Sequence, residues 1–272
     1  PMGLVEFDTS ILLQNPSLLG LYLHNTGLQK FPNVSSLKSS LQVLHVYENE
    51  ISHVPLDVFA LPNETKEAFQ IFPHLTSFNL QSNPYTNLSA KMFEFMPNLK
   101  NLRYYSSTKN LKIDPDLSIL TETLETILLG SLLQPTPGMF GMKKLKNLFS
   151  RHYDEDLFPF SLPFLTSLPK LERIDIWKTW RKYIPNLCAV VNSTSVVKVH
   201  FSRYSRLQCD YNMCWMKEGC SKIMFTVGAL EQQCHTPSYY YGILWNSLSL
   251  EQLSCQGNKC LLYLDDNLIE NW

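Results

Sequence analysis

One spacing of apolar residues recurs along most of the chain. Residues 41–51 and 75–85 both follow the pattern L-x-x-L-x-L-x-x-N-x-L, with Phe and Tyr as apolar replacements in the second copy. The same frame, in stronger or weaker form, begins at residues 18, 41, 75, 99, 124, 145, 171 and 196. Units of this length cannot bury their apolar side chains alone, so neighbouring units must stack to form a continuous core. The chain is therefore expected to fold as a solenoid.

The frame also predicts the local structure of each unit. Two apolar residues separated by one position place their side chains on the same face of a short strand. The Asn near the end of the frame has a side-chain amide that can satisfy backbone groups where the chain turns out of the strand. When such coils stack, their strands form a parallel sheet along one side of the solenoid.

Two parts of the chain depart from the regular repeat. Leu4, Phe7 and Leu12 match later positions of a repeat, which predicts a first unit truncated before Leu18 and a longer natural protein. The step from 41 to 75 is the longest, and its surplus lies around the polar residues 61–68. We interpret this surplus as an outward loop, and a tolerated insertion without a role is the default because loops accept insertions at low cost.

Composition and motifs exclude several classes of function. The 23 basic and 24 acidic residues give a net charge of −1, which disfavours non-specific binding of nucleic acid or of anionic membranes. No apolar stretch approaches the roughly 20 residues of a membrane-spanning helix. The sequence has no catalytic serine elbow, zinc-protease motif or phosphate-binding glycine loop. We therefore expect no enzyme activity, no cofactor and no metal.

Cysteines and glycosylation signals indicate an oxidising compartment. Six of the seven cysteines follow residue 200, and Cys188 precedes them, which suggests a local disulfide-bonded module. The alternative is a set of reduced, buried thiols in a cytosolic protein. Four Asn-x-Ser/Thr sequons favour the extracellular interpretation: Asn33, Asn63, Asn87 and Asn192.

The segment from Leu207 onward resembles the cysteine-rich C-terminal cap of extracellular leucine-rich-repeat proteins. It contains Leu207-Gln-Cys209, then Cys214-Trp215, then Cys234-His-Thr-Pro237, and finally Cys255. One departure is that Tyr211 stands where the family has its second cysteine, so Cys214 is the nearest substitute.

The resemblance implies a fold, a domain division and two disulfides. The fold is an α/β-type solenoid, a right-handed coil with a curved parallel sheet on its concave face and an irregular or short-helical convex side. Repeats would occupy residues 1–206 and the cap residues 207–272. The family's pairing implies Cys209–Cys234 and Cys214–Cys255, with Trp215 packed under the cap. The partners of the remaining cysteines stay open: Cys188, Cys220 and Cys260.

The concave face is the candidate binding surface. Residues between and just after the strand leucines face this side, and they are rich in the residue types that dominate binding hot spots. Eight strands about 4.8 Å apart give on the order of 750 Å², close to the area of a standard protein interface. For each single aromatic residue, packing between strands is the alternative. The predicted contact residues are Tyr22, His24, His45, Tyr47, Arg103, Tyr105, Phe149, Arg151 and Trp177.

Three functional hypotheses follow. The first is an extracellular, non-enzymatic module that recognises a protein or glycoprotein, in a secreted protein or in a Toll-like or other cell-surface receptor whose membrane segment lies outside the printed chain. The second is a non-catalytic accessory subunit of a secreted enzyme complex. The third is an intracellular repeat scaffold, which gel mobility with and without reductant would distinguish from the other two.

Overall fold

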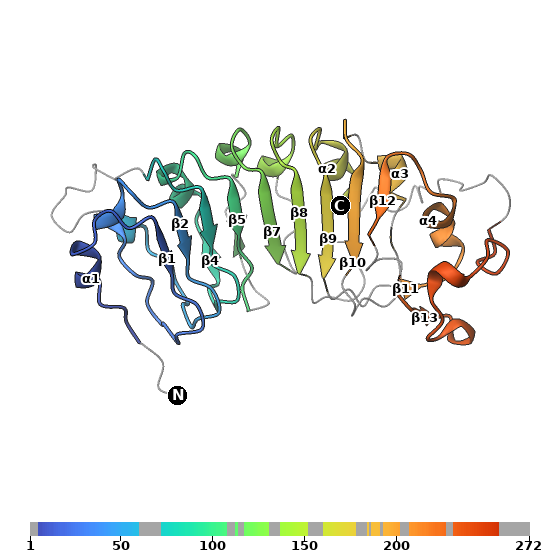
Figure 1. The fold of residues 1–272 in the computed structure, drawn as a ribbon, viewed down its shortest axis with the longest axis horizontal. Coiled ribbons are helices and arrows are strands. Elements are labelled where there is room, and N and C mark those ends of the chain that lie inside the picture. Colours follow the sequence, from blue (N-terminus) through green and yellow to red (C-terminus); the bar gives the residue numbers. More distant parts are fainter. Residues whose placement is uncertain are drawn as a thin grey trace.

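The strands of the repeats lie side by side in one long sheet (Figure 1). The computed structural model describes residues 5–59, 72–107, 112–113, 117–130, 137–151, 160–177, 184, 186–190, 193–201, 207–226 and 231–255. Within these ranges nine strands pair in parallel, in the order β1-β2-β3-β5-β7-β8-β9-β10-β12. Their bounds are β1 Gly20–Tyr22, β2 Val43–His45, β3 Ser77–Asn79, β5 Asn101–Arg103, β7 Thr126–Gly130, β8 Asn147–Arg151, β9 Arg173–Trp177, β10 Val197–Phe201 and β12 Ile223–Phe225. The predicted parallel sheet is confirmed.

The register of the sheet follows the sequence frame. Leu21 pairs with Leu44, and Leu44 pairs with Phe78, so the fourth position of each unit occupies one inward row. The row continues through the later strands and its members are at most 7% exposed: Leu21, Leu44, Phe78, Leu102, Ile127, Leu148, Ile174 and Val199. Burial of this row contributes to the stability of each repeat, because removal of apolar surface from water drives folding.

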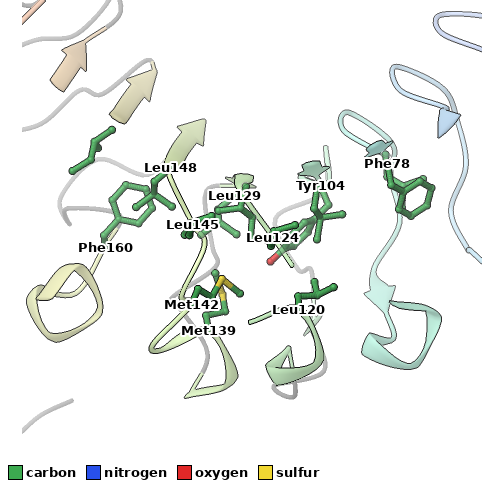
Figure 2. Close-up of a cluster of buried hydrophobic side chains, with 14 of the residues drawn as sticks. Phe78, Tyr104, Leu120, Leu124, Leu129, Met139, Met142, Leu145, Leu148 and Phe160 are labelled. Carbon is green, nitrogen blue, oxygen red and sulfur yellow. The ribbon is translucent and has the colours of Figure 1, made fainter. Parts of the chain in front are cut away.

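Short helices form the other wall of the core. They are α1 Ser10–Leu13, η1 Ser35–Leu37, η2 Leu56–Phe59, η3 Ala90–Phe95, η4 Ser118–Leu120, η5 Pro137–Met139, α2 Leu162–Thr166 and α3 Leu187–Val190. Figure 2 shows Leu120 of η4 and Met139 of η5 on the side of the cluster opposite Leu129 and Leu148 of the strands. Leu145, at the start of one repeat, lies between these two walls and is fully buried. Each coil thus packs its own strand against its own helical segment and against its neighbours.

Asn side chains close the turn after the strand in two repeats. The Asn49 amide accepts from the Leu28 backbone N–H at 3.2 Å and donates to the Leu23 carbonyl at 2.6 Å. The Asn83 amide likewise donates to the Val46 carbonyl at 2.7 Å. These bonds join adjacent coils and confirm the predicted role of the Asn position.

Three disulfides stabilise the C-terminal end. Cys209–Cys234 and Cys214–Cys255 have the pairing that the resemblance implied, and Cys188–Cys220 is a third bridge. The surrounding elements are β11 Leu207–Gln208, η6 Tyr211–Met213, α4 Cys214–Glu218, β13 Cys234–Thr236, η7 Ser238–Tyr240 and η8 Trp245–Ser247, with β11 and β13 paired in parallel. β12 belongs to the main sheet although it lies within the segment expected to be cap, so the sheet extends one strand past the last predicted repeat start.

Trp215 is buried where the last coil meets the cap. Its side chain is 4% exposed, and its indole N–H donates to the Ile184 carbonyl at 3.4 Å. Its ring centroid lies 5.6 Å from that of Phe225 in β12. The prediction that this tryptophan packs under the cap is confirmed.

Some predicted features lie outside the described residues: the surplus loop at 61–68, the sequons at Asn63 and Asn192, and Cys260. A further two-stranded parallel pair is formed by β4 Asn87–Leu88 and β6 Lys112–Ile113. In the part of the chain that the structure describes, every helix is too short or too polar to cross a bilayer.

Candidate binding surface

The outward side chains of the sheet form three parallel columns. Successive strand residues point to opposite faces, so positions three, five and seven of each unit share the face opposite the core. The fifth-position column is fixed by the strand register and consists of Tyr22, His45, Asn79, Arg103, Leu128, Phe149, Asp175 and His200. The column is therefore a continuous row across eight strands, but Asn79, Leu128 and Asp175 within it are buried.

Four aromatic rings cluster at the N-terminal end of this face; we call them the aromatic patch (Tyr22, His24, His45 and Tyr47). The Tyr22 and His45 rings meet edge to face with centroids 5.1 Å apart. The His24 and Tyr47 rings stack with centroids 5.0 Å apart. Tyr22 is 59% exposed, and His24 is also exposed, so the patch offers aromatic surface to a partner.

His45 is the most constrained member of the aromatic patch. Its Nε2 lies 3.0 Å from the Ser77 hydroxyl on β3. Burial lowers the pKa of the His45 imidazole, and the nearby Arg103 guanidinium on β5 lowers it further. The neutral ring is therefore favoured, which suits packing against its aromatic neighbours.

A second cluster lies towards the C-terminal end of the face; we call it the basic patch (Phe149, Arg173, Asp175, Trp177 and Lys198). The Arg173 guanidinium binds the Asp175 carboxylate with two bonds of 2.9 Å, from Nε and from Nη2. The guanidinium carbon lies 5.9 Å from the centre of the Phe149 ring. The hydrogen bonds to Asp175 raise the pKa of Arg173, so this side chain is a permanent cation.

Trp177 completes this cluster on the same strand. Residues 173, 175 and 177 alternate along β9, so their side chains share the outward face. The Trp177 side chain remains 40% exposed. The arrangement combines an oriented guanidinium with a half-exposed indole, the two side-chain types that most often anchor protein interfaces.

The other predicted contact residues fall in different places. Arg103 is exposed on β5, between the two patches. Arg151 pairs with Trp177 through the β8–β9 register, so its backbone lies in the seventh-position column. Tyr105 is only 3% exposed, and its hydroxyl hydrogen-bonds to the Ser82 hydroxyl. The expectation that Tyr105 is presented on the concave face is therefore wrong.

Strand length alone does not explain the burial of Tyr105. Tyr105 lies two residues past the end of β5, but His24 lies equally far past the end of β1 and is exposed. Trp177 lies within β9, where the alternation of faces keeps it on the outward side. The hydrogen bond between the Tyr105 and Ser82 hydroxyls is one contact that holds Tyr105 in its buried position.

The sequence analysis missed the third-position column. This row consists of Gly20, Val43, Ser77, Asn101, Thr126, Asn147, Arg173, Lys198 and Met224. It supplies both cations of the basic patch. The period of two along each strand was a sufficient signal, because positions three and five share a face within each strand.

Comparisons with known proteins bear on the fold. No family model matches the chain, and no curated protein sequence matches it. Among solved structures it is similar to human 5T4, also described as Wnt-activated inhibitory factor 1 or trophoblast glycoprotein, with a TM-score of 0.52 and 15% identity over 89% of this chain and 96% of that chain. It is also similar to a chain in the octameric complex of Latrophilin 3, Unc5D and FLRT2 (LRR), with a TM-score of 0.47 and 19% identity over 91% of this chain and 86% of that one.

The repeat frame, the sheet and the bridges agree with one another, and the fold is similar to that of the first neighbour. Stacked coils with a continuous parallel sheet are the architecture that the 20–29-residue leucine-rich frame specifies. The three disulfides lie at the end of the solenoid where such proteins carry a cysteine-rich cap. The chain is a leucine-rich-repeat solenoid with a disulfide-bonded C-terminal cap.

Proposed function

We propose that this solenoid is an extracellular recognition module that binds a protein or glycoprotein partner on the outward face of its sheet. The observation that carries the proposal is the basic patch, in which Trp177 is 40% exposed beside an Arg173 guanidinium fixed by Asp175. Side chains held in place before binding lose little conformational freedom when a partner arrives. The face can therefore contribute most of its contact energy to affinity.

The disulfides support the extracellular part of the proposal. Six cysteines in three bridges are typical of proteins that fold in an oxidising compartment, whereas cytosolic thiols stay reduced. The glycoprotein name of 5T4 agrees with such a location. Reduced and non-reduced samples should therefore differ in gel mobility, and identical mobility would favour the intracellular scaffold.

Recognition is favoured over catalysis by the state of the polar groups on this face. Asp175 is tied to Arg173, while His45 and His200 contact the hydroxyls of Ser77 and Thr226. A hydroxyl–histidine pair acts as nucleophile and base when a third group, usually a carboxylate, orients the histidine. Among the described residues no acidic side chain is hydrogen-bonded to His45 or His200. These contacts instead fix side chains across neighbouring strands.

Site-specific photo-crosslinking tests the proposal. A benzophenone amino acid would replace Trp177 in one variant and Phe140 in another. Phe140 is a matched control because it is 39% exposed but follows η5 on the helical side of its coil. Both variants would be irradiated in extracellular fluid from the source organism, and the adducts identified by mass spectrometry.

We expect one discrete protein adduct at position 177 that is absent at position 140. An excess of wild-type protein lacking the crosslinker should weaken this adduct by competing for the partner. Tyr22→Ala or Trp177→Ala protein should compete less and leave more of the adduct. Equal labelling at both positions would contradict a binding site on the sheet face. A crosslinked catalytic subunit would support the accessory-subunit alternative.

A further inference from the structure

The outward face of the sheet has an unbalanced charge. Its third- and fifth-position columns contain three cations, Arg103, Arg173 and Lys198, and one acid, Asp175. Three minus one gives a net charge of +2 in these two columns, whereas the whole chain carries −1. The Asp175 side chain is 3% exposed and engaged by Arg173, so a partner would meet only cations.

The adjoining row at the start of the strands does not cancel this charge. In four successive repeats the second position is occupied by Lys100, Glu125, Lys146 and Glu172. The net charge of these four side chains is zero. Glu125 is shared by Lys100 at 3.7 Å and by Lys146 at 3.3 Å. The positive character of the face is therefore a property of its two central columns.

Two cations are neighbours at the basic patch. Lys198 on β10 pairs in register with Arg173 on β9, and like charges directly opposite on neighbouring strands repel. Asp175 offsets the charge of Arg173, but within the described residues Lys198 has no acidic side chain within ion-pair distance. An external anion between the two side chains would relieve this repulsion.

Arg173 also retains hydrogen-bonding capacity in an orientation set by the protein. A guanidinium has five N–H donors, and the Asp175 carboxylate takes two, which leaves three. The Arg173 side chain is 45% exposed, so the remaining donors are accessible. Planar guanidinium donors match carboxylate oxygens in geometry.

We propose that the partner places a carboxylate-rich protein segment on the basic patch, with its acidic side chains between Arg173 and Lys198 and its apolar side chains against Trp177. The proposal rests on the proposed function and specifies the chemistry of the partner. Electrostatic complementarity of this kind raises the association rate and excludes partners with a basic surface. Arg103, towards the middle of the sheet, extends the positive track along the same face.

The spacing of the cations favours a protein segment over a sulfated glycan. Phe149, Trp177 and Met224 separate and flank the basic residues, and Met224 is 53% exposed. A polyanionic glycan is best held by a dense run of Lys and Arg, whereas mixed aromatic and basic residues match the side chains of a polypeptide. The glycan is therefore an outcome of the test and not the proposal.

A library of phage-displayed random 12-residue peptides tests the proposal on the intact chain. It would be selected against immobilised wild-type protein at about 0.15 M salt, where surface charges further apart than about 8 Å are screened. The affinities of the selected peptides would be measured against Lys198→Gln and against the double variant Arg173→Gln/Asp175→Asn. The double variant avoids an unpaired buried carboxylate, which could prevent folding. Lys91→Gln is the matched control, an exposed lysine on η3.

We expect the selected peptides to be enriched in Asp and Glu. Their affinity should fall about ten- to a hundredfold in the double variant and about tenfold in Lys198→Gln, and should not change in Lys91→Gln. Thermal melting of the double variant would confirm that it is folded.

The other outcomes separate the two proposals. Peptides without acidic enrichment that lose affinity in Trp177→Ala would overturn the carboxylate proposal and leave recognition by this face intact. A heparin oligosaccharide that binds in a Lys198-dependent way when no acidic peptide is selected would also overturn it, in favour of a glycan. No selection of any peptide and no heparin binding, or peptides insensitive to both Trp177→Ala and Lys198→Gln, would contradict both proposals.

Discussion

Single polar side chains connect neighbouring coils of the solenoid. Asn49 is 6% exposed, and its amide bonds to backbone groups of the preceding coil and to the Tyr47 carbonyl of its own coil. The sequence predicted this role because an amide can both donate and accept, which Thr and Ser can do only in part. Thr26 shows the difference, since its hydroxyl contacts the Asn49 amide oxygen instead of bridging backbone groups itself.

Replacing Asn49 with Ala should lower the free energy of unfolding by roughly 1–3 kcal/mol, because buried backbone groups would lose their partners. Asn246→Ala is the matched control at an exposed position and should change it little. Urea denaturation followed by circular dichroism measures both. A loss for Asn49→Ala no larger than that of the control would contradict the role of the amide.

His45 should make stability depend on pH. Its pKa in the folded chain is lowered from 6.5, mainly by burial and then by Arg103. The unfolded chain therefore binds a proton more readily than the folded chain, and stability is lost as the pH falls below 6.5 towards the folded pKa. Between about pH 7.5 and about pH 5.5, wild type should lose more stability than His45→Gln.

The control for this pH effect is His24→Gln, which removes an exposed imidazole from the same aromatic patch. In the His24→Gln protein, the further substitution His45→Gln should reduce the pH dependence as it does in wild type. Urea midpoints at the two pH values measure the difference. Parallel pH profiles for wild type and His45→Gln would show that His45 does not contribute.

At the scale of the strand, the sequence predicted the inward face better than the outward face. The inward row is specified by size and apolarity, and the frame locates it in eight strands. β12 was missed because Ile223-Met224-Phe225 lacks the leading leucines of the frame and follows a cysteine. Its place beside β10 depends on the chain path between Cys209 and Cys220, which no local pattern encodes.

The outward face was only partly predictable because a position in the frame does not by itself determine exposure: His24 is exposed and Tyr105 is buried, although each lies two residues past its strand. Tyr105 and Trp177 occupy the same position of the frame, but only Trp177 lies within its strand. Arg173 was not predicted because it precedes the apolar pair of its strand, whereas the predicted contact residues lie between and just after such pairs. Its bond to Asp175 is specific to one strand, and no repeat pattern carries that information.

Leu44→Ala should lower the free energy of unfolding by roughly 2–5 kcal/mol, because it removes a fully buried side chain that lies between Leu21 and Phe78 of the neighbouring strands. Gln42 lies two residues earlier and is exposed, so Gln42→Ala should lower the free energy of unfolding much less. Chemical denaturation of both variants tests whether Leu44 contributes to the core. Comparable losses at the two positions would mean that Leu44 is not the buried, stabilising residue of its repeat.

The whole molecule behaves as a stack in which each coil contacts mainly its neighbours. Stability in such folds is a sum of unit and interface contributions, and unfolding can begin at either end. The disulfides restrain the C-terminal end, and Cys188–Cys220 links α3 to the segment just before β12. The sequence left this pairing open because spacing alone does not determine connectivity.

Cys188→Ser/Cys220→Ser should destabilise the C-terminal end by roughly 2–4 kcal/mol, since the bridge closes a loop with a sequence separation of 32. Hydrogen exchange read by mass spectrometry should show faster exchange in β10 and β12 and little change in β2 and β3. Uniform acceleration throughout the chain would instead indicate that the whole stack unfolds as one cooperative unit.

The position of β12 has a consequence for protein engineering. The cysteine-rich segment contributes β12 to the same sheet that carries the basic patch. Met224 therefore continues the row of Arg173 and Lys198. In a chimaera joined at residue 206, β12 would come from a different protein than the other strands of the sheet. Exchange of this end between related solenoids should therefore carry part of the binding specificity with it.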